Sequence, residues 1–163
     1  MICYHDMSNW LKALISITIP LVVGFTSSLF NETGEGSWYT SIKKPEWNPP
    51  GWVFAPVWTT LYIMMGFALF LVWKSKADSK QESKAIIFWI IQMVLNFFWT
   101  FIFFGQQQIA GALIEIILLW FAILITIFLF ARIDKLAAWL LVPYISWVSF
   151  AALLNLAIWQ LNR

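Results

Sequence analysis

The sequence predicts an all-α membrane protein, a bundle of five transmembrane helices that forms one integral membrane domain over residues 1–163. Hydrophobic side chains make up 61% of the chain and charged ones only 11%, whereas a soluble domain carries about 25% charged residues. Five separate apolar runs each approach the roughly 20 residues that a helix needs to cross a bilayer. Ten basic and eight acidic side chains cannot solvate this apolar mass, so lipid is its expected solvent.

The five runs follow one another with hydrophilic breaks between them. They are Leu11–Phe30, Trp52–Trp73, Ala85–Phe104, Ala110–Ala131 and Leu136–Gln160. The later breaks, such as Gly105–Gln108 and Arg132–Lys135, leave room for little more than a reversal of the chain. Short connections make sequential helices antiparallel neighbours, so we expect a compact up-and-down bundle.

The first connection, Asn31 to Gly51, is the exception because it is long and rich in aromatic residues and prolines. It contains Trp38, Tyr39, Pro45, Trp47, Pro49 and Pro50. Long loops within compact domains are often functional, and prolines stiffen such a segment. The aromatic content fits two alternatives equally: an ordered loop that caps a cavity at one end of the bundle, or a segment in the interfacial aromatic belt.

The basic residues are distributed unequally between the two ends of the bundle. One end carries seven of them: Lys12, Lys74, Lys76, Lys80, Lys84, Arg132 and Lys135. The other end has Lys43, Lys44 and Arg163. The positive-inside rule then places the N-terminus in the cytoplasm and the long connection outside, for a protein of the cell (plasma) membrane.

Several kinds of chemistry lack support in the composition and the motifs. With a single cysteine, Cys3, and a single histidine, His5, both expected in a short exposed tail, neither a disulfide framework nor a metal site is expected. The net charge of +2 does not suggest a nucleic-acid partner. No glycine-rich phosphate loop, carboxylate pair or Ser/His/Asp set is present, which removes support for a hydrolase or a kinase.

Aromatic and polar side chains share one face on each of three predicted helices. The sets are Trp58 with Tyr62; Gln92, Asn96, Trp99 and Phe103; and Tyr144, Trp147, Ala151 and Asn155. Asn and Gln are not tolerated against lipid, so these faces should point inward. Two interpretations stay open with equal weight: the amides hydrogen-bond between helices, or the three faces line a binding cavity.

Two further features lie within the predicted spans. Glu115 is the one carboxylate clearly inside a span; it is a functional candidate by default, although its face, with Ala112 and Thr126, favours a structural role in helix packing. The first helix carries Ser16, Pro20, Gly24 and Ser28 at a spacing of four. Small residues at that spacing allow close approach of a second helix, either within the bundle or in a dimer.

Three stretches follow one another along the chain: WYTSIKKPEWNPPGWVFAPVWTTLY from Trp38 to Tyr62, QMVLNFFWTFIFF from Gln92 to Phe104, and PYISWVSFAALLN from Pro143 to Asn155. In this order they resemble the motifs of the translocator protein family, also called the tryptophan-rich sensory protein or peripheral benzodiazepine receptor family (TspO/MBR). The resemblance extends from about Pro20 to the C-terminus. It implies a five-helix bundle whose cavity opens towards the first loop, which closes over it.

The resemblance also implies ligands and the residues that hold them. Family members bind porphyrins such as protoporphyrin IX and synthetic isoquinoline or benzodiazepine ligands, and we expect a homodimer. The ligand-binding positions carry over to Tyr39, Trp47, Pro49, Trp58, Asn96, Trp99, Trp147 and Ala151. Porphyrin is expected as ligand or substrate, and no resident cofactor is expected. Lys43 and Lys44 are candidates to meet its propionates, unless they are simply solvated.

The expected function is that of a tetrapyrrole-binding membrane translocator or sensor. The alternative is enzyme-like: bacterial relatives are credited with a light-driven, tryptophan-dependent breakdown of porphyrin, which would make Trp58 and Trp147 the catalytic residues. Transport of porphyrin or another small molecule ranks lower because the chain shows no internal repeat. The cholesterol motif of animal members departs here, with Leu156 and Gln160 in place of Tyr and Arg, so recognition of cholesterol is not expected.

Overall fold

The computed structural model describes residues 7–31, 34, 36–75 and 77–163, and these fold into five helices long and apolar enough to cross a membrane. Their cores are α1 (Asn9–Ser28), α3 (Phe54–Trp73), α4 (Ser79–Thr100), α5 (Ile109–Ala131) and α7 (Val142–Asn162). Short elements extend them: η2 (Gly51–Val53) precedes α3, the π-helical turn η3 (Phe101–Gly105) follows α4, and α6 (Lys135–Leu140) precedes α7. The all-helical, five-span prediction is confirmed.

Two helix boundaries differ from the sequence-based expectation, each for a local reason. Helix α4 begins at Ser79 rather than near Ala85, because the Asp78 side chain caps it by accepting from the backbone N–H of Lys80 at 3.1 Å. The last run is interrupted at Leu141, between α6 and α7. Pro143 explains that break, since it has no N–H to offer the carbonyl of Trp139 one turn earlier.

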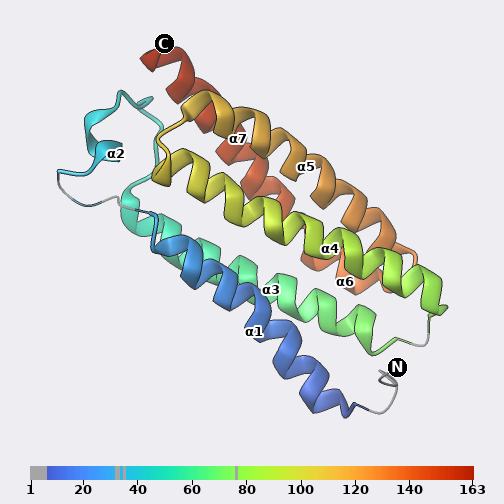
Figure 1. Ribbon diagram of the computed structural model, residues 1–163. Helices are drawn as coiled ribbons and strands as arrows, with labels where there is room; N and C mark the ends of the chain where they lie inside the picture. The colour runs from blue at the N-terminus through green and yellow to red at the C-terminus, as the bar shows by residue number, and fades with distance from the viewer. Residues whose placement is uncertain (1–6, 32–33, 35, 76) are drawn as a thin grey trace.

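The helices close into a ring in the order α1, α3, α7, α5, α4, with α6 packed against α3 and α5 (Figure 1). Helices α4 and α5 form a close antiparallel hairpin, as expected from their short connection. Helices α3 and α4 are also joined by a short connection, yet they touch only slightly, because α1 packs against both. The expectation that every sequential pair would be close neighbours is therefore wrong for this pair.

Helix α1 approaches α3 closely at a glycine. A Cβ placed on Gly66 would lie 2.7 Å from both the Cα of Ile17 and the carbonyl oxygen of Ser16. That carbonyl has no intrahelical donor, because the residue four positions later is Pro20. The small-residue face of α1 therefore serves at this point as a contact within the bundle, which was one of the two alternatives left open for it.

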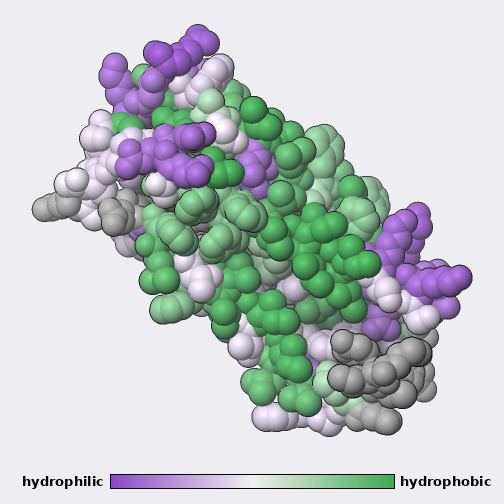
Figure 2. All heavy atoms as spheres, in the orientation of Figure 1, coloured by the Kyte–Doolittle hydropathy of each residue, from purple (hydrophilic) through white to green (hydrophobic). Residues whose placement is uncertain are grey.

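The surface is divided into an apolar belt and two polar ends, as a membrane-spanning bundle requires. Figure 2 shows hydrophobic side chains over the middle of the molecule and hydrophilic ones gathered at its two ends. Large side chains such as Ile114, Phe128 and Val22 are more than half exposed on the outside of the helices. Because there are five spans, the beginning of α1 and the end of α7 lie at opposite ends of the bundle (Figure 1).

The long first connection packs onto the ends of α4 and α7. It contains the short helix α2 (Trp38–Ser41), and the rings of Trp38 and Tyr39 contact Phe103 at centroid distances of 5.7 and 6.3 Å. Further along, the Asn162 side chain accepts from the backbone N–H of Lys43 at 3.0 Å and donates to its carbonyl at 2.8 Å. The connection is thus tied to the end of the bundle where the chain finishes.

Candidate ligand cavity

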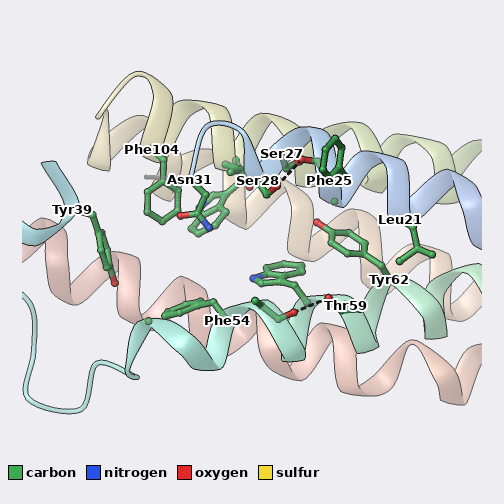
Figure 3. Close-up of a pocket in the computed structure, with 16 residues that line it drawn as sticks. Leu21, Phe25, Ser27, Ser28, Asn31, Tyr39, Phe54, Thr59, Tyr62 and Phe104 are labelled. Atoms are coloured by element: carbon green, nitrogen blue, oxygen red, sulfur yellow. Dashed lines mark hydrogen bonds between the residues drawn. The ribbon is translucent and has the colours of Figure 1, made fainter. Parts of the chain in front are cut away.

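A cavity of about 490 Å³ lies at that same end, between α1, α3, the end of α4 and the first connection (Figure 3). Helix α1 contributes Leu21, Gly24, Phe25, Ser27 and Ser28, and the connection contributes Asn31, Tyr39 and Gly51. Helix α3 contributes Phe54, Ala55, Trp58, Thr59 and Tyr62, while α4 and η3 contribute Trp99, Thr100 and Phe104. The volume falls within the roughly 300–1,000 Å³ of small-molecule sites.

Seven of the 16 residues that line the cavity are aromatic. Trp58 and Tyr62, one turn apart on α3, are stacked with centroids 5.6 Å apart and planes at 28°. On the opposite wall, Trp99 is stacked on Phe103 at 5.4 Å and 21°. Phe104 enters the cavity from η3, a π-helical turn of a kind that is rare overall and frequent at functional sites. Flat apolar surfaces therefore face the cavity from α3 and from α4.

Tyr62 is held in place by a hydrogen-bonded clamp that joins three helices. Its hydroxyl donates to Oδ1 of Asn96 at 2.8 Å, and Nδ2 of Asn96 donates to the Tyr144 hydroxyl at 3.2 Å. Asn96 and Tyr144 are both fully buried, and Trp58 also contacts the Tyr144 ring edge-on at 6.3 Å. The clamp fixes the inner end of the cavity, because moving the Tyr62 side chain to another χ1 rotamer would break a buried hydrogen bond.

The cavity offers a few polar groups and no charged one among its described lining residues. The hydroxyls of Ser28 and Thr59 are used within their own helices, where they donate to the carbonyls of Phe25 and Ala55 (Figure 3). By contrast, Oγ of Ser27 and Oδ1 of Asn31 are buried without a partner among the described residues. Buried polar atoms are normally paired, so these two are available to a ligand or a bound water.

Tyr39 lines the cavity on the side of the connection. Its hydroxyl donates to Oδ1 of Asn48 at 2.9 Å, and its ring packs on Phe104 at 5.4 Å. The Lys44 ammonium lies over the same ring, 4.7 Å from its centroid, and donates to the Tyr39 carbonyl. Burial raises the pKa of the Tyr39 phenol above its ordinary value of 10, although the hydrogen bond with Asn48 opposes that shift.

A second row of aromatic rings lies behind the cavity wall on the α7 side. Phe54, which lines the cavity, contacts Trp147 at 6.1 Å; Trp147 contacts Phe150 at 5.4 Å, and Phe150 contacts Trp47 of the connection at 5.7 Å. The indole Nε1 of Trp147 is buried without a partner among the described residues. Trp147 is therefore one ring away from the cavity that Trp58 faces.

The sequence-predicted ligand positions divide into those that line the cavity and those that do not. Tyr39, Trp58 and Trp99 line it. Asn96 lies behind Tyr62, Trp147 lies behind Phe54, and Trp47 packs on Phe150 with half of its surface exposed. Pro49 and Ala151 are not part of the lining; the Pro49 carbonyl accepts from Asn48, and Ala151 is buried. The ligand-binding role of all eight stays a prediction.

The contribution of α1 to the cavity was not recognised from the sequence. Five of its residues line the wall, among them Gly24, whose missing side chain makes room for the Tyr62 ring. The available signal was the face that carries Gly24 and Ser28 at a spacing of four, which we interpreted only as a helix contact. Ser27, the buried hydroxyl of this wall, lies next to that face and has no pattern of its own.

The other inward polar residues have different environments. Asn155 hydrogen-bonds between helices, since it accepts from Nε1 of Trp99 at 3.3 Å and donates to the Ile109 carbonyl at 3.0 Å. Gln92 and Glu115 are 1% and 7% exposed, and neither side chain has a hydrogen-bond partner within the described ranges. All three are buried, which confirms that these polar faces point inward. Cys3 and His5, which were expected in an exposed tail, lie outside the described residues.

Comparison with known proteins identifies relatives over almost the whole chain. The model of the TspO/MBR family matches residues 16–160. A tryptophan-rich protein TspO from Chlorobaculum tepidum is 44% identical over 152 residues, which is 93% of this chain and 96% of the relative. The translocator protein of Homo sapiens is 38% identical over 156 residues, covering 94% and 92% of the two chains. A tryptophan-rich sensory protein from Cereibacter sphaeroides is 37% identical over 125 residues, or 77% of each chain.

Proposed function

The chain belongs to the TspO/MBR family, and from this premise we propose that it binds a tetrapyrrole such as protoporphyrin IX in the cavity between α1, α3, α4 and the first connection. Relatives carry the names translocator protein and tryptophan-rich sensory protein, so a translocator or sensor role is the coarser expectation. The observation that supports the finer proposal is a cavity of about 490 Å³ with stacked aromatic pairs on two sides.

The cavity wall is chemically suited to a flat conjugated ring system. Indole and phenol faces attract such a ring by dispersion and by offset stacking, which adds about 0.5–1.5 kcal/mol for each aromatic pair. Trp58 and Trp99 are the largest surfaces available for this contact, and they come from different helices. A macrocycle placed between them would replace contacts with lipid by contacts with protein on both of its faces.

The propionates of the ligand need polar partners, and the cavity supplies them at the end nearest the connection. Among the described residues, the buried Ser27 hydroxyl has no partner and can donate to a carboxylate, whereas the unpaired Oδ1 of Asn31 can only accept. The Lys44 ammonium is one ring away, on the outer side of Tyr39. We infer that the propionates point towards the Ser27 hydroxyl and that a small movement of Tyr39 brings Lys44 to them. The exposed Lys43 is a weaker candidate, because its backbone is tied to Asn162.

We further propose that the first connection acts as the cap of the cavity. It contributes Asn31, Tyr39 and Gly51 to the lining, and its contacts with Phe103 and Asn162 hold it against the bundle. Prolines at positions 45, 49 and 50 reduce the conformational freedom that such a cap would lose on closing. A ligand would enter by displacing the Tyr39 side chain, which is held by one hydrogen bond, by ring contacts and by the Lys44 ammonium over its ring.

The test is a titration of the detergent-purified protein with protoporphyrin IX in the dark, followed by the Soret band. We expect saturable binding that weakens about tenfold in Trp58→Ala and in Trp99→Ala, since each variant loses one stacking face. Trp139→Ala is the matched control, because Trp139 is 69% exposed on α6 and outside the cavity. Unchanged affinity in both cavity variants would refute the proposed site.

A second candidate function, light-driven oxidation of the bound porphyrin, is favoured by one specific observation: Trp58 faces the cavity directly. Indole is readily oxidised and could donate one electron to the photoexcited macrocycle, which passes it to dioxygen. The superoxide so formed adds to the ring, and the adduct returns one electron to the indole radical cation, so the ring takes up one dioxygen and the indole is restored. To discriminate the two functions, the Trp58→Phe and Trp147→Phe variants would be saturated with porphyrin and illuminated, and the product formed by each would be measured. Loss of product in Trp58→Phe alone would establish Trp58 as the donor, whereas wild-type bleaching in both variants would mean unassisted photodecay.

We also propose that the N-terminus faces the cytoplasm of the cell that makes the protein, with the cavity opening on the opposite side. The support is the excess of Lys and Arg at the end that holds Lys12 and Lys74. A membrane-impermeant reagent applied to intact cells should label Lys43→Cys and spare Lys80→Cys. The reverse labelling pattern would invert the topology.

A further inference from the structure

A second hollow lies at the opposite end of the bundle from the ligand cavity and plays no part in the proposed porphyrin site. It is a groove of about 650 Å³ between α1 and α4, with the end of α3 as its floor. Its apolar walls are Ile19, Leu69, Trp73, Ile86, Ile87 and Ile90. None of these residues lines the ligand cavity, so the two sites can be altered separately.

The groove exists because α1 and α4 touch at one end and spread apart at the other. Near the ligand cavity, the Phe30 ring that follows α1 packs edge-on against Phe97 and Phe101 at 5.9 and 5.2 Å. Towards the beginnings of α1 and α4 the helices diverge, as Figure 1 shows, and α3 alone separates them. The result is a wedge-shaped groove that narrows towards Phe30 and widens towards the beginnings of α1 and α4.

The groove opens sideways into the bilayer. Ile19, Ile87 and Ile90 line it and are 40%, 54% and 49% exposed. These side chains lie within spans, where the surrounding solvent is hydrocarbon. The occupant of the apolar part must therefore come from the membrane, and a single acyl chain has the elongated shape and the chemistry that the walls require.

The end of the groove nearest the bundle surface is polar and carries a cation. Lys12 lines it together with the hydroxyl side chains of Ser79 and Ser83. The carboxylate of Glu82 belongs to the same lining, so a headgroup would place its phosphate on Lys12 and its hydroxyls towards Glu82. The Lys12 ammonium has three N–H donors, and the hydrogen bond that the structure gives it is a long one, 3.4 Å, to the Trp73 carbonyl. This end of the protein also holds most of the basic residues of the chain, which raises the local positive potential.

We propose that this groove is a binding site for one membrane phospholipid, with an acyl chain between α1 and α4 and the headgroup phosphate on Lys12. A phospholipid matches this hollow because the apolar wedge and the ammonium lie at its two ends, just as the acyl chain and the phosphate lie at the two ends of the lipid. Lipids with a chain but no phosphate lack the second half of this match. Filling the wedge would also lock the spread of α1 relative to α4.

The test is native mass spectrometry of the full-length protein in detergent, with phosphatidylglycerol and a diacylglycerol of the same acyl chains as probes. We expect one tightly held phosphatidylglycerol and about tenfold weaker retention of diacylglycerol. Lys12→Gln should bring phosphatidylglycerol down to the diacylglycerol level, a loss that corresponds to ~1.4 kcal/mol. Ile87→Trp should remove the bound lipid of both kinds, because the larger side chain fills the groove.

Matched controls separate this result from general effects on folding or on charge. Lys43→Gln removes a cation at the other end of the bundle, and Ile114→Trp enlarges an exposed apolar side chain of α5 outside the groove. Both should retain phosphatidylglycerol like the wild type, and all four variants should unfold at the wild-type temperature in lipid-free detergent. Equal retention of the two probes by the wild type, or wild-type retention by folded Lys12→Gln or Ile87→Trp, would overturn the proposal.

Discussion

Adding one methyl group at Gly24 should displace the ring that closes the inner end of the ligand cavity. A Cβ at this position would lie 2.3 Å from Cε2 and 2.5 Å from Cδ2 of Tyr62. The ring would have to move by about 1 Å to reach ordinary van der Waals contact. It cannot simply swing away, because its hydroxyl donates to Asn96 at 2.8 Å and its face is stacked on Trp58.

The expected cost of Gly24→Ala has two parts. Overpacking a well-filled site costs about 1–3 kcal/mol, and loss of the hydrogen bond to Asn96 adds roughly 0.6 kcal/mol, the average for such bonds in membrane proteins. The higher helix propensity of Ala relative to Gly offsets up to about 1 kcal/mol of this destabilisation. We therefore expect a net destabilisation on the order of 1–2 kcal/mol, together with weaker binding of protoporphyrin IX.

A double-mutant cycle with Tyr62→Ala measures whether the clash with this ring is the cause. Unfolding by a denaturing detergent would be followed for the wild type, Gly24→Ala, Tyr62→Ala and the double variant. Removing the ring should make Gly24→Ala neutral or stabilising, which gives a coupling energy of at least about 1 kcal/mol. The reasoning is refuted if Gly24→Ala costs the same in the two backgrounds.

Three further predictions concern other contacts of the bundle. Gly66→Ala should destabilise the protein by about 1–3 kcal/mol, because its Cβ would meet the backbone of α1, which cannot yield as a side chain can; wild-type stability in detergent unfolding would contradict that close approach. Asn96→Leu should cost about 1 kcal/mol, since it removes two hydrogen bonds of the clamp, and a variant as stable as the wild type would mean that the clamp contributes nothing. The Tyr39 phenol should titrate above pH 10 in the ultraviolet difference spectrum between the wild type and Tyr39→Phe, because burial raises its pKa. The stability that the packed neutral phenol contributes is therefore complete below pH 10 and is lost as the pH rises through the raised pKa. Titration at or below pH 10 would contradict the burial of this side chain.

The five spans could be predicted from the sequence because each depends on a local property, namely a run of apolar residues long enough to cross a bilayer. The inward direction of Gln92, Asn96 and Asn155 was predictable for the same reason, since an amide facing hydrocarbon is costly whatever the tertiary structure. The break before α7 has a local signal in Pro143, but this proline lies within an apolar run long enough to be read as one continuous span.

The positions around the cavity were less predictable, because they depend on how helices distant in sequence come together. Trp58 and Trp147 are both tryptophans on inward faces of their helices. Trp58 lines the cavity, whereas Phe54 lies between Trp147 and the cavity. Asn96 is buried as expected, but Tyr62 and Tyr144 use its amide and hold it away from the cavity. No pattern in one helix reports which neighbouring side chain occupies the space in front of it.

The spread of α1 from α4 was also outside the reach of sequence patterns. Helix α1 contacts α3 at Gly66 through its backbone, which fixes one side of its position. Its distance from α4 is then set by the bulk of Phe30 and Phe97 at one end, while the described residues include no aromatic pair between these helices at the other end. The groove between them follows from this difference in contacts and has no motif of its own.

The central claim, that the porphyrin site is the cavity under the first connection, is tested most directly by filling each hollow in turn. Ala55→Trp places an indole in the cavity, and Ile87→Trp places one in the groove between α1 and α4. Dark titration with protoporphyrin IX should show no saturable Soret change for Ala55→Trp and wild-type affinity for Ile87→Trp, with both variants folded by thermal unfolding. Wild-type binding by Ala55→Trp, or loss of binding in Ile87→Trp, would contradict the account.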